Sequence, residues 1–222
     1  LILHLVPLLY QHSFCKLNLK RIMKTIGILG GSRFSNNTQY YNIAQNIGKF
    51  LHTHNYNIIC GGGRGIMSAL ASSYIDNPER CSRVCLESDI HSDNENYHFD
   101  NIGTKITVST LDNQSHTIFN NSDICIFFPG GSGTIHEFSK FLAYDLHNTK
   151  KMVLLGSYFE TLYDIITNHN KYTPLITEKI TSNYDMYVNN TIFFVNDNLL
   201  TNKNTFEEYI TCLLYTSDAA DE

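Results

Sequence analysis

The stretch Phe127-Phe128-Pro129-Gly130-Gly131-Ser132-Gly133-Thr134-Ile135-His136-Glu137 indicates how the chain folds. The apolar run Ile124 to Phe128 before the turn is typical of a buried strand, and the amphipathic segment Thr134 to Tyr144 after it is typical of a helix. The sequence therefore predicts a strand, a glycine loop and a helix in succession. This arrangement points free backbone N–H groups at the start of the helix toward an anion.

The residue types in this turn indicate what the loop binds. Glycine allows a tight turn and leaves no side chain where a ligand must approach the backbone. Glu137 falls in the first turn of the predicted helix, at the same mouth. We interpret the stretch as a phosphate-binding loop with a carboxylate at its edge, which indicates a nucleotide or a sugar phosphate as the ligand.

The rest of the chain alternates between apolar strand patterns and helical patterns. Strands are predicted at 25–29, 56–60, 82–86, 105–109, 124–128, 151–156 and 191–195, and helices at 35–51, 66–70, 112–121, 134–144, 158–168 and 205–210. Most of these strands are continuously apolar, which is typical of a parallel sheet covered on both faces. We predict an α/β fold, an open doubly wound, Rossmann-like sheet that is mostly parallel. A closed eight-fold barrel needs more units than the chain holds.

Three glycine-rich segments follow predicted strands: Gly30-Gly31, Gly61 to Gly65, and Gly130 to Gly133. In an open sheet, ligands bind beyond the carboxyl ends of the strands, near the point where the strand order reverses. We therefore expect the three loops to meet at one site. The polar segment Glu87 to Thr104 shows no period and is predicted to be a long functional loop.

Composition and the two ends limit the domain organisation. The net charge is −5 and no long Lys/Arg cluster occurs, which disfavours nucleic-acid binding. We interpret residues 1–22 as a non-native or disordered extension, since the apolar part is too short to cross a membrane. Residues 212–222 resemble a translated sequencing adapter. This leaves residues 23–211 as a single domain, which we expect in the cytoplasm, where Cys60 and Cys125 would be free thiols.

Several common motifs are absent from the sequence. The dinucleotide fingerprint Gly-x-Gly-x-x-Gly requires a glycine at position 66, where Ile66 stands. The chain contains no P-loop motif of the form Gly-x-x-x-x-Gly-Lys-Ser/Thr, and the spacing of Gly130 to Gly133 does not match a Gly-x-Ser-x-Gly hydrolase elbow. The glycine loops therefore belong to another class of nucleotide-binding protein.

The glycine loops resemble those of the LONELY GUY (LOG) family, once labelled lysine decarboxylase-like. The family motif Pro-Gly-Gly-x-Gly-Thr-x-x-Glu is present in full from Pro129 to Glu137. A second motif, Gly-Gly-Gly-x-Gly-(Ile/Leu)-Met, is present from Gly61 to Met67, and a third, a strand ending in Gly-Ser, at Gly31-Ser32. The resemblance covers roughly residues 23 to 168.

The resemblance implies an activity, a set of site residues and a homodimer. LOG proteins cleave the N-glycosidic bond of nucleoside 5′-monophosphates, such as cytokinin ribotides, and release ribose 5-phosphate without a metal or organic cofactor. It implies that Glu137 is catalytic and acts at the ribose. It further implies that the phosphate and nucleotide are bound by Gly31, Ser32, Gly62, Gly63, Arg64, Gln114, Gly130, Gly131, Ser132, Gly133 and Thr134.

One position departs from the family pattern. The family carries Arg-Lys on the helix before the motif strand, and this chain has Gln114 and Ser115 there. Because glutamine supplies no charge to a phosphate or leaving base, the substitution weakens the prediction of cleavage. The alternative is a protein that binds a nucleotide or phosphorylated cofactor without cleaving it, as the related molybdenum-cofactor carriers do. A DNA-protecting relative is disfavoured by the acidic charge.

Overall fold

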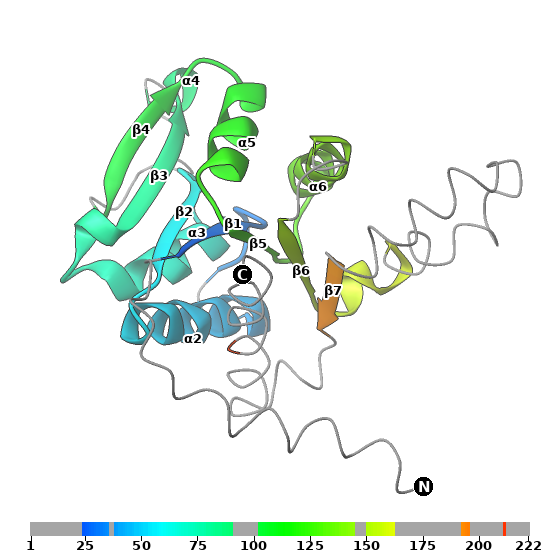
Figure 1. Ribbon diagram of the computed structural model, residues 1–222, viewed down its shortest axis with the longest axis horizontal. Coiled ribbons are helices and arrows are strands. Elements are labelled where there is room, and N and C mark those ends of the chain that lie inside the picture. The colour runs from blue at the N-terminus through cyan, green and yellow to red at the C-terminus, as the bar shows by residue number, and fades with distance from the viewer. Residues whose placement is uncertain are drawn as a thin grey trace, which may run out of the picture.

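A computed structural model describes residues 24–35, 38–90, 102–144, 150–162, 192–195 and 211. Within these residues, seven strands form one sheet in the order β4-β3-β2-β1-β5-β6-β7, and every neighbouring pair is parallel (Figure 1). The predicted α/β fold is confirmed. The strands are β1 (Thr25–Leu29), β2 (Asn57–Gly61), β3 (Cys81–Leu86), β4 (Thr104–Val108), β5 (Ile124–Phe127), β6 (Lys151–Leu155) and β7 (Ile192–Val195).

Helices cover both faces of the sheet (Figure 1). They are α2 (Gln39–Thr53), α3 (Ile66–Ala71), α4 (Glu87–Ile90), α5 (Leu111–Asn120) and α6 (Ser132–Tyr144), with short 3-10 turns at Ser72–Tyr74, Pro78–Arg80 and Ser157–Phe159. One core cluster joins α2 and α3 to one face of the sheet, and a second joins α5 and α6 to the other face. The continuously apolar strands follow from this arrangement, because both sides of each central strand are buried.

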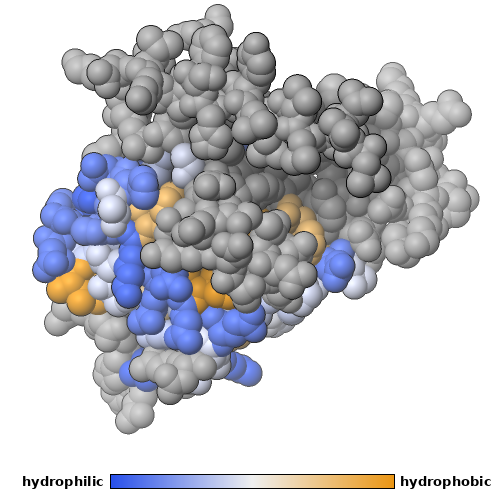
Figure 2. Space-filling model, turned by 90° about the horizontal axis from the view of Figure 1, so that it is seen from below, coloured by the Kyte–Doolittle hydropathy of each residue, from blue (hydrophilic) through white to orange (hydrophobic). Residues whose placement is uncertain are grey.

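The periodicity of α2 shows how the sequence positions a covering helix. Its buried residues recur at helical spacing, while Gln39, Asn42, Asn46, Lys49 and Thr53 form an exposed stripe three or four residues apart. Figure 2 shows this side of the molecule, where hydrophilic residues make up most of the coloured surface. In the described part of the chain, no helix is long and apolar enough to cross a membrane.

The boundaries of some elements differ from the predicted ones. Helix α5 begins at Leu111, one residue earlier than predicted, because the side chain of Thr110 caps it by accepting the N–H of Asn113. Helix α6 begins at Ser132, two residues earlier than predicted, so the glycine loop flows directly into the helix. The first four residues of the predicted polar loop, Glu87–Ile90, form a helical turn. Residues 91–101 of that loop, the predicted helix 205–210 and the end of helix 158–168 lie outside the described residues.

The strand order fixes where a ligand site belongs. From β1 the chain proceeds through β2 and β3 to β4 on one side, and from β5 through β6 to β7 on the other. The order therefore reverses between β1 and β5. In an open parallel sheet the crevice for a ligand lies at the carboxyl ends of these two strands.

Candidate functional site

The three glycine loops meet at the reversal point, as predicted. The N–H of Gly31, after β1, donates to the carbonyl oxygen of Pro129, after β5, at 3.0 Å. The N–H of Ile66, which starts α3, donates to the carbonyl oxygen of Gly31 at 3.2 Å. Backbone hydrogen bonds thus tie the loops after β1, β2 and β5 into one surface.

Two glycines make this close approach possible. Gly65 has a φ of 68°, and a Cβ atom there would lie 2.5 Å from the carbonyl oxygen of Gly31. A Cβ atom on Gly130 would lie 2.0 Å from Oγ1 of Thr134 and 2.9 Å from the backbone nitrogen of Gly31. Any larger residue at either position would force the loops apart.

The next two glycines of the motif lie in a different environment. Gly131, Ser132 and Gly133 are exposed, and a Cβ atom on Gly131 or Gly133 would meet no atom within 4 Å. Packing therefore does not require glycine at these two positions. The first N–H groups of a helix have no partner within the helix, so the start of α6 presents hydrogen-bond donors to this open space. Thr134, in contrast, is buried at 4 % exposure beneath Gly130.

Glu137 lies in the second turn of α6, three residues after Thr134. Its side chain is half-buried, on the same side of the helix as the buried residues Thr134 and Phe141. Removal from water disfavours the ionised carboxylate and raises the pKa of Glu137 from 4.5 to about 7. A carboxyl group with this pKa exchanges protons near neutral pH, which suits a general acid or base.

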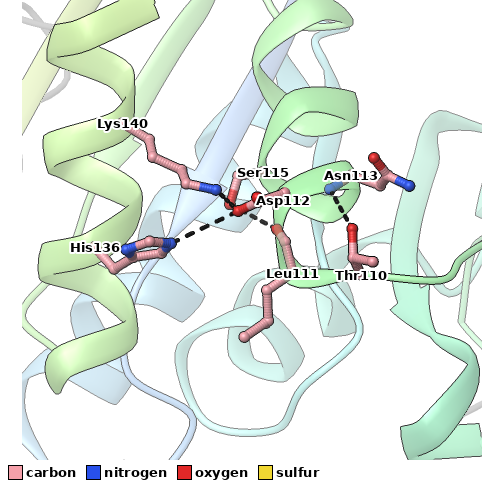
Figure 3. A network of polar contacts seen from close by, with 7 residues as sticks. All are labelled: Thr110, Leu111, Asp112, Asn113, Ser115, His136 and Lys140. Carbon is pink, nitrogen blue, oxygen red and sulfur yellow. Dashed lines mark hydrogen bonds and ion pairs between the residues drawn. The ribbon is translucent and has the colours of Figure 1, made fainter.

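The first turn of α5 is joined to the side of α6 (Figure 3). The carboxylate of Asp112 forms an ion pair with Lys140, and its Oδ1 lies 3.9 Å from Nε2 of His136. Because the side chain of Asp112 is 70 % exposed, this ion pair adds little to the free energy of unfolding. The side chain of His136 is 54 % exposed and points toward Asp112 of α5 (Figure 3).

Gln114, the residue at the family arginine position, is buried at 9 % exposure. Its Nε2 donates to the carbonyl oxygen of Val84 at 2.8 Å, and the same oxygen accepts the N–H of Gly62 at 2.8 Å. Gln114 also lies 3.7 Å from the position of a Cβ atom on Gly61. Its amide therefore anchors α5 to the same carbonyl group of β3 that holds the second glycine loop.

The structure adds one residue that the sequence reasoning missed. Arg83, on β3, is 2 % exposed, and its Nη2 donates to the carbonyl oxygens of Gly62 at 3.0 Å and Gly63 at 2.9 Å. A charged residue inside an otherwise apolar strand pattern was the signal available in the sequence, because a buried arginine requires specific partners.

The predicted site residues fall into two groups. Gly31, Gly62, Gly63, Gly130 and Thr134 form the joined framework of the loops, while Ser32, Arg64, Gly131, Ser132 and Gly133 lie at or near its surface. The side chains of Ser32 and Arg64 are exposed. Among the described residues, no group of three His, Cys, Asp or Glu side chains is arranged to bind a metal ion.

Comparison with known proteins places this geometry in a family context. None of the curated proteins matches the chain. The molybdenum cofactor binding protein of the phototrophic bacterium Rippkaea orientalis is similar in structure, with a TM-score of 0.55, 16 % identity, and coverage of 87 % of this chain and 98 % of that one. The Moco carrier protein of Chlamydomonas rheinhardtii gives a TM-score of 0.53 and 16 % identity, over 86 % of this chain and 99 % of that one. At these identities the likeness concerns the fold.

The family match itself is more extensive. The model of the SLOG cluster4 family matches residues 23–184, a range that includes β1 to β6 and all three glycine loops. The resemblance to the LONELY GUY family is confirmed at the coarser level of this LOG-like fold. Since the match covers most of the chain, the protein belongs to the SLOG cluster4 family.

Proposed function

We propose that this protein binds a nucleoside 5′-monophosphate, or a related phosphorylated cofactor, without cleaving it. The observation that carries the proposal is the open space over Gly131 and Gly133 at the start of α6, next to the loops after β1 and β2. The unpaired N–H groups of a helix start bind phosphate oxygens, and glycine lets those oxygens approach the backbone. Both motif glycines are thus accounted for by a ligand, since neighbouring atoms do not require them.

The position of Gln114 favours binding over cleavage. In the LOG family an arginine at this position is regarded as catalytic, whereas the amide of Gln114 is buried and bonded to the backbone of β3. A neutral side chain held in this way supplies no positive charge to a phosphate or a departing base. The likeness to two molybdenum-cofactor proteins agrees with a carrier function. We further expect the protein to act as a cytoplasmic homodimer.

A second candidate function is the hydrolysis of the N-glycosidic bond. It is favoured by Glu137, which lies beside the phosphate loop with a pKa raised to about 7 by burial. A carboxylate in this position can stabilise an oxocarbenium-like state or remove a proton from an attacking water. The reaction would release a free base and ribose 5-phosphate, and it would involve neither a metal nor an organic cofactor.

Two measurements on the same sample separate these functions. The 222-residue chain is mixed with AMP, GMP, CMP or UMP, and both thermal stabilisation and release of ribose 5-phosphate are measured. Stabilisation without product supports the binding function. Product release that Glu137→Ala abolishes supports the hydrolase. A folded protein that none of the four nucleotides or inorganic phosphate stabilises would contradict both.

A further inference from the structure

Arg83 lies behind the second glycine loop, on the side of the sheet covered by α2 and α3. Side chains alternate along a strand, so Arg83 shares this face with Cys81 and Cys85, while Val84 points to the opposite face. Its guanidinium donates from Nη2 to the carbonyl oxygens of Gly62 and Gly63. One arginine therefore binds two successive peptide groups of the loop.

Because the peptide bond is planar, the contact of Arg83 with the two carbonyl groups also fixes the direction of the N–H groups that follow them. In a trans peptide, the C=O of one residue and the N–H of the next point in opposite directions. No cis peptide occurs in the described residues, so the N–H groups of Gly63 and Arg64 point away from Arg83. No backbone carbonyl of the described residues accepts a hydrogen bond from either group. Two adjacent N–H groups that point the same way form a concavity suited to an anion.

Other contacts hold the loop in this orientation. The N–H of Gly62 donates to the carbonyl oxygen of Val84 at 2.8 Å, and Oγ of Ser68 lies 3.5 Å from the carbonyl oxygen of Gly63. A Cβ atom on Gly63 would lie 3.4 Å from Cβ of Ser32, in the first glycine loop. The outward side of the second loop therefore adjoins the site already described.

The charge of Arg83 acts on its surroundings. The pKa of the Cys60 thiol is lowered, first by a hydrogen bond from Cys81 and also by the nearby arginine. Burial raises the pKa of Cys85 to about 11, and the attraction of Arg83 for the thiolate opposes this rise. A positive charge in a buried position is felt strongly by neighbouring groups, because little water screens it.

We propose that Arg83 is a positioning residue that prepares the Gly62–Gly65 loop as a second anion-binding element, formed by the N–H groups of Gly63 and Arg64. Its carbonyl contacts orient the two donors, and its charge lies behind them. The group bound there is an oxyanion: an oxygen of the ligand phosphate or a second acidic group of the same ligand. This inference rests on the proposed function, in which the start of α6 forms the first anion-binding element.

The test uses backbone amide NMR shifts of the 222-residue chain during titration with inorganic phosphate and with AMP, at ionic strength held constant with chloride. We expect the amide signals of Gly63 and Arg64 to move together with those of Gly133 and Thr134. In Arg83→Met, the shifts at Gly63 and Arg64 should disappear and the apparent Kd for phosphate should rise about tenfold, the loss expected for hydrogen bonds to a charged group. Arg83→Lys keeps the charge and should retain part of the affinity.

Arg80→Met is the matched control. Arg80 also donates from Nη2 to two carbonyl oxygens, those of His52 at 3.2 Å and Tyr56 at 2.8 Å, but it precedes β3 and lies at the opposite end of the sheet. We expect a comparable loss of thermal stability with the phosphate response unchanged.

The outcomes distinguish this inference from the proposed function. Signals at Gly133 and Thr134 that move while those of Gly63 and Arg64 stay fixed would overturn the role of Arg83 and leave the proposed function intact. A Kd for phosphate that is equal in Arg83→Met, Arg80→Met and the unmodified protein would also overturn the role of Arg83 and leave the proposed function intact. If no signal in either loop responds to phosphate or AMP, both are wrong. If Arg83→Met does not fold, the inference is tested by the phosphate affinity of Arg83→Lys and by the amide signals of Gly63 and Arg64 in the unmodified protein.

Discussion

The backbone N–H of Gly31 donates to the carbonyl oxygen of Pro129 at 3.0 Å, although the two residues lie 98 positions apart in the sequence. This bond connects the ends of β1 and β5, the two strands between which the sheet order reverses. It brings the family motif after β5 against the loop after β1, where a Cβ atom on Gly31 would lie 3.2 Å from Cα of Gly130. The candidate site therefore depends on two backbones that approach each other without side chains between them.

Substitution by alanine should destabilise the protein at Gly130 and leave its stability almost unchanged at the adjacent Gly131. In Gly130→Ala the new methyl group meets Thr134 and the backbone nitrogen of Gly31, and a backbone atom cannot rotate away. We expect a loss of about 3 kcal/mol in the free energy of unfolding. Gly131→Ala enters open space and should change the stability by less than about 0.5 kcal/mol. Urea denaturation of the two variants measures the contrast, and equal losses would show that the loops are packed differently.

Glu137 should make the stability depend on pH. Its pKa is about 7 in the folded protein, compared with 4.5 for an ordinary glutamate. Below about pH 3.5 the carboxyl is protonated in both states, whereas between about pH 4.5 and 7 the unfolded chain ionises while the folded protein keeps the proton, so the stability falls over this range. Glu137→Gln should therefore be more stable than the unmodified protein by on the order of 3 kcal/mol at pH 8 and of equal stability at about pH 3.5.

Glu160→Gln provides the control for this comparison, because Glu160 is exposed. Thermal denaturation at both pH values should show no such pH-dependent gain in this variant. If Glu137→Gln lowers the stability at pH 8, the carboxylate has a stabilising partner and the account of its burial is wrong.

We predict that Gln114 stabilises the fold and does not contact the ligand. In Gln114→Leu the carbonyl oxygen of Val84 loses one donor and keeps the N–H of Gly62, so we expect a loss of about 1 kcal/mol in stability. The affinity for AMP should change less than about twofold, because the amide group is already occupied by β3. A loss of affinity of tenfold or more, measured by calorimetry, would instead indicate a direct contact with the ligand.

Much of the fold was predictable because its signals are local. Continuous apolar runs such as Ile124 to Phe128 can be satisfied only in a strand covered on both faces, and the glycine segments mark the ends of such strands. The rule that ligands bind at the carboxyl ends of parallel strands then predicts that Gly31, Gly63 and Gly130 lie close together.

The contacts that depend on distant residues were not predictable. Arg83 lies on β3 and Gly62 directly follows β2, so only the register of β2 with β3 brings the guanidinium beneath the loop. The bond from Gln114 to Val84 requires the packing of α5 on the sheet, and the sequence offers only a glutamine at helical spacing. The raised pKa of Glu137 likewise arises from burial in the folded chain. Local patterns therefore identify the loops, whereas tertiary packing determines which side chains support them.

The central claim, that the glycine loops bind the phosphate group, is tested most directly by calorimetric titration of the 222-residue chain and of Gly133→Ala with AMP and with adenosine. Gly133→Ala should be at least as stable as the unmodified protein, because alanine is favoured in a helix and no atom lies within 4 Å of the new methyl group. We predict that the unmodified protein binds AMP at least about tenfold more tightly than adenosine, and that Gly133→Ala removes most of this difference. Equal affinities for AMP and adenosine, or an AMP affinity that Gly133→Ala leaves unchanged, would contradict the account.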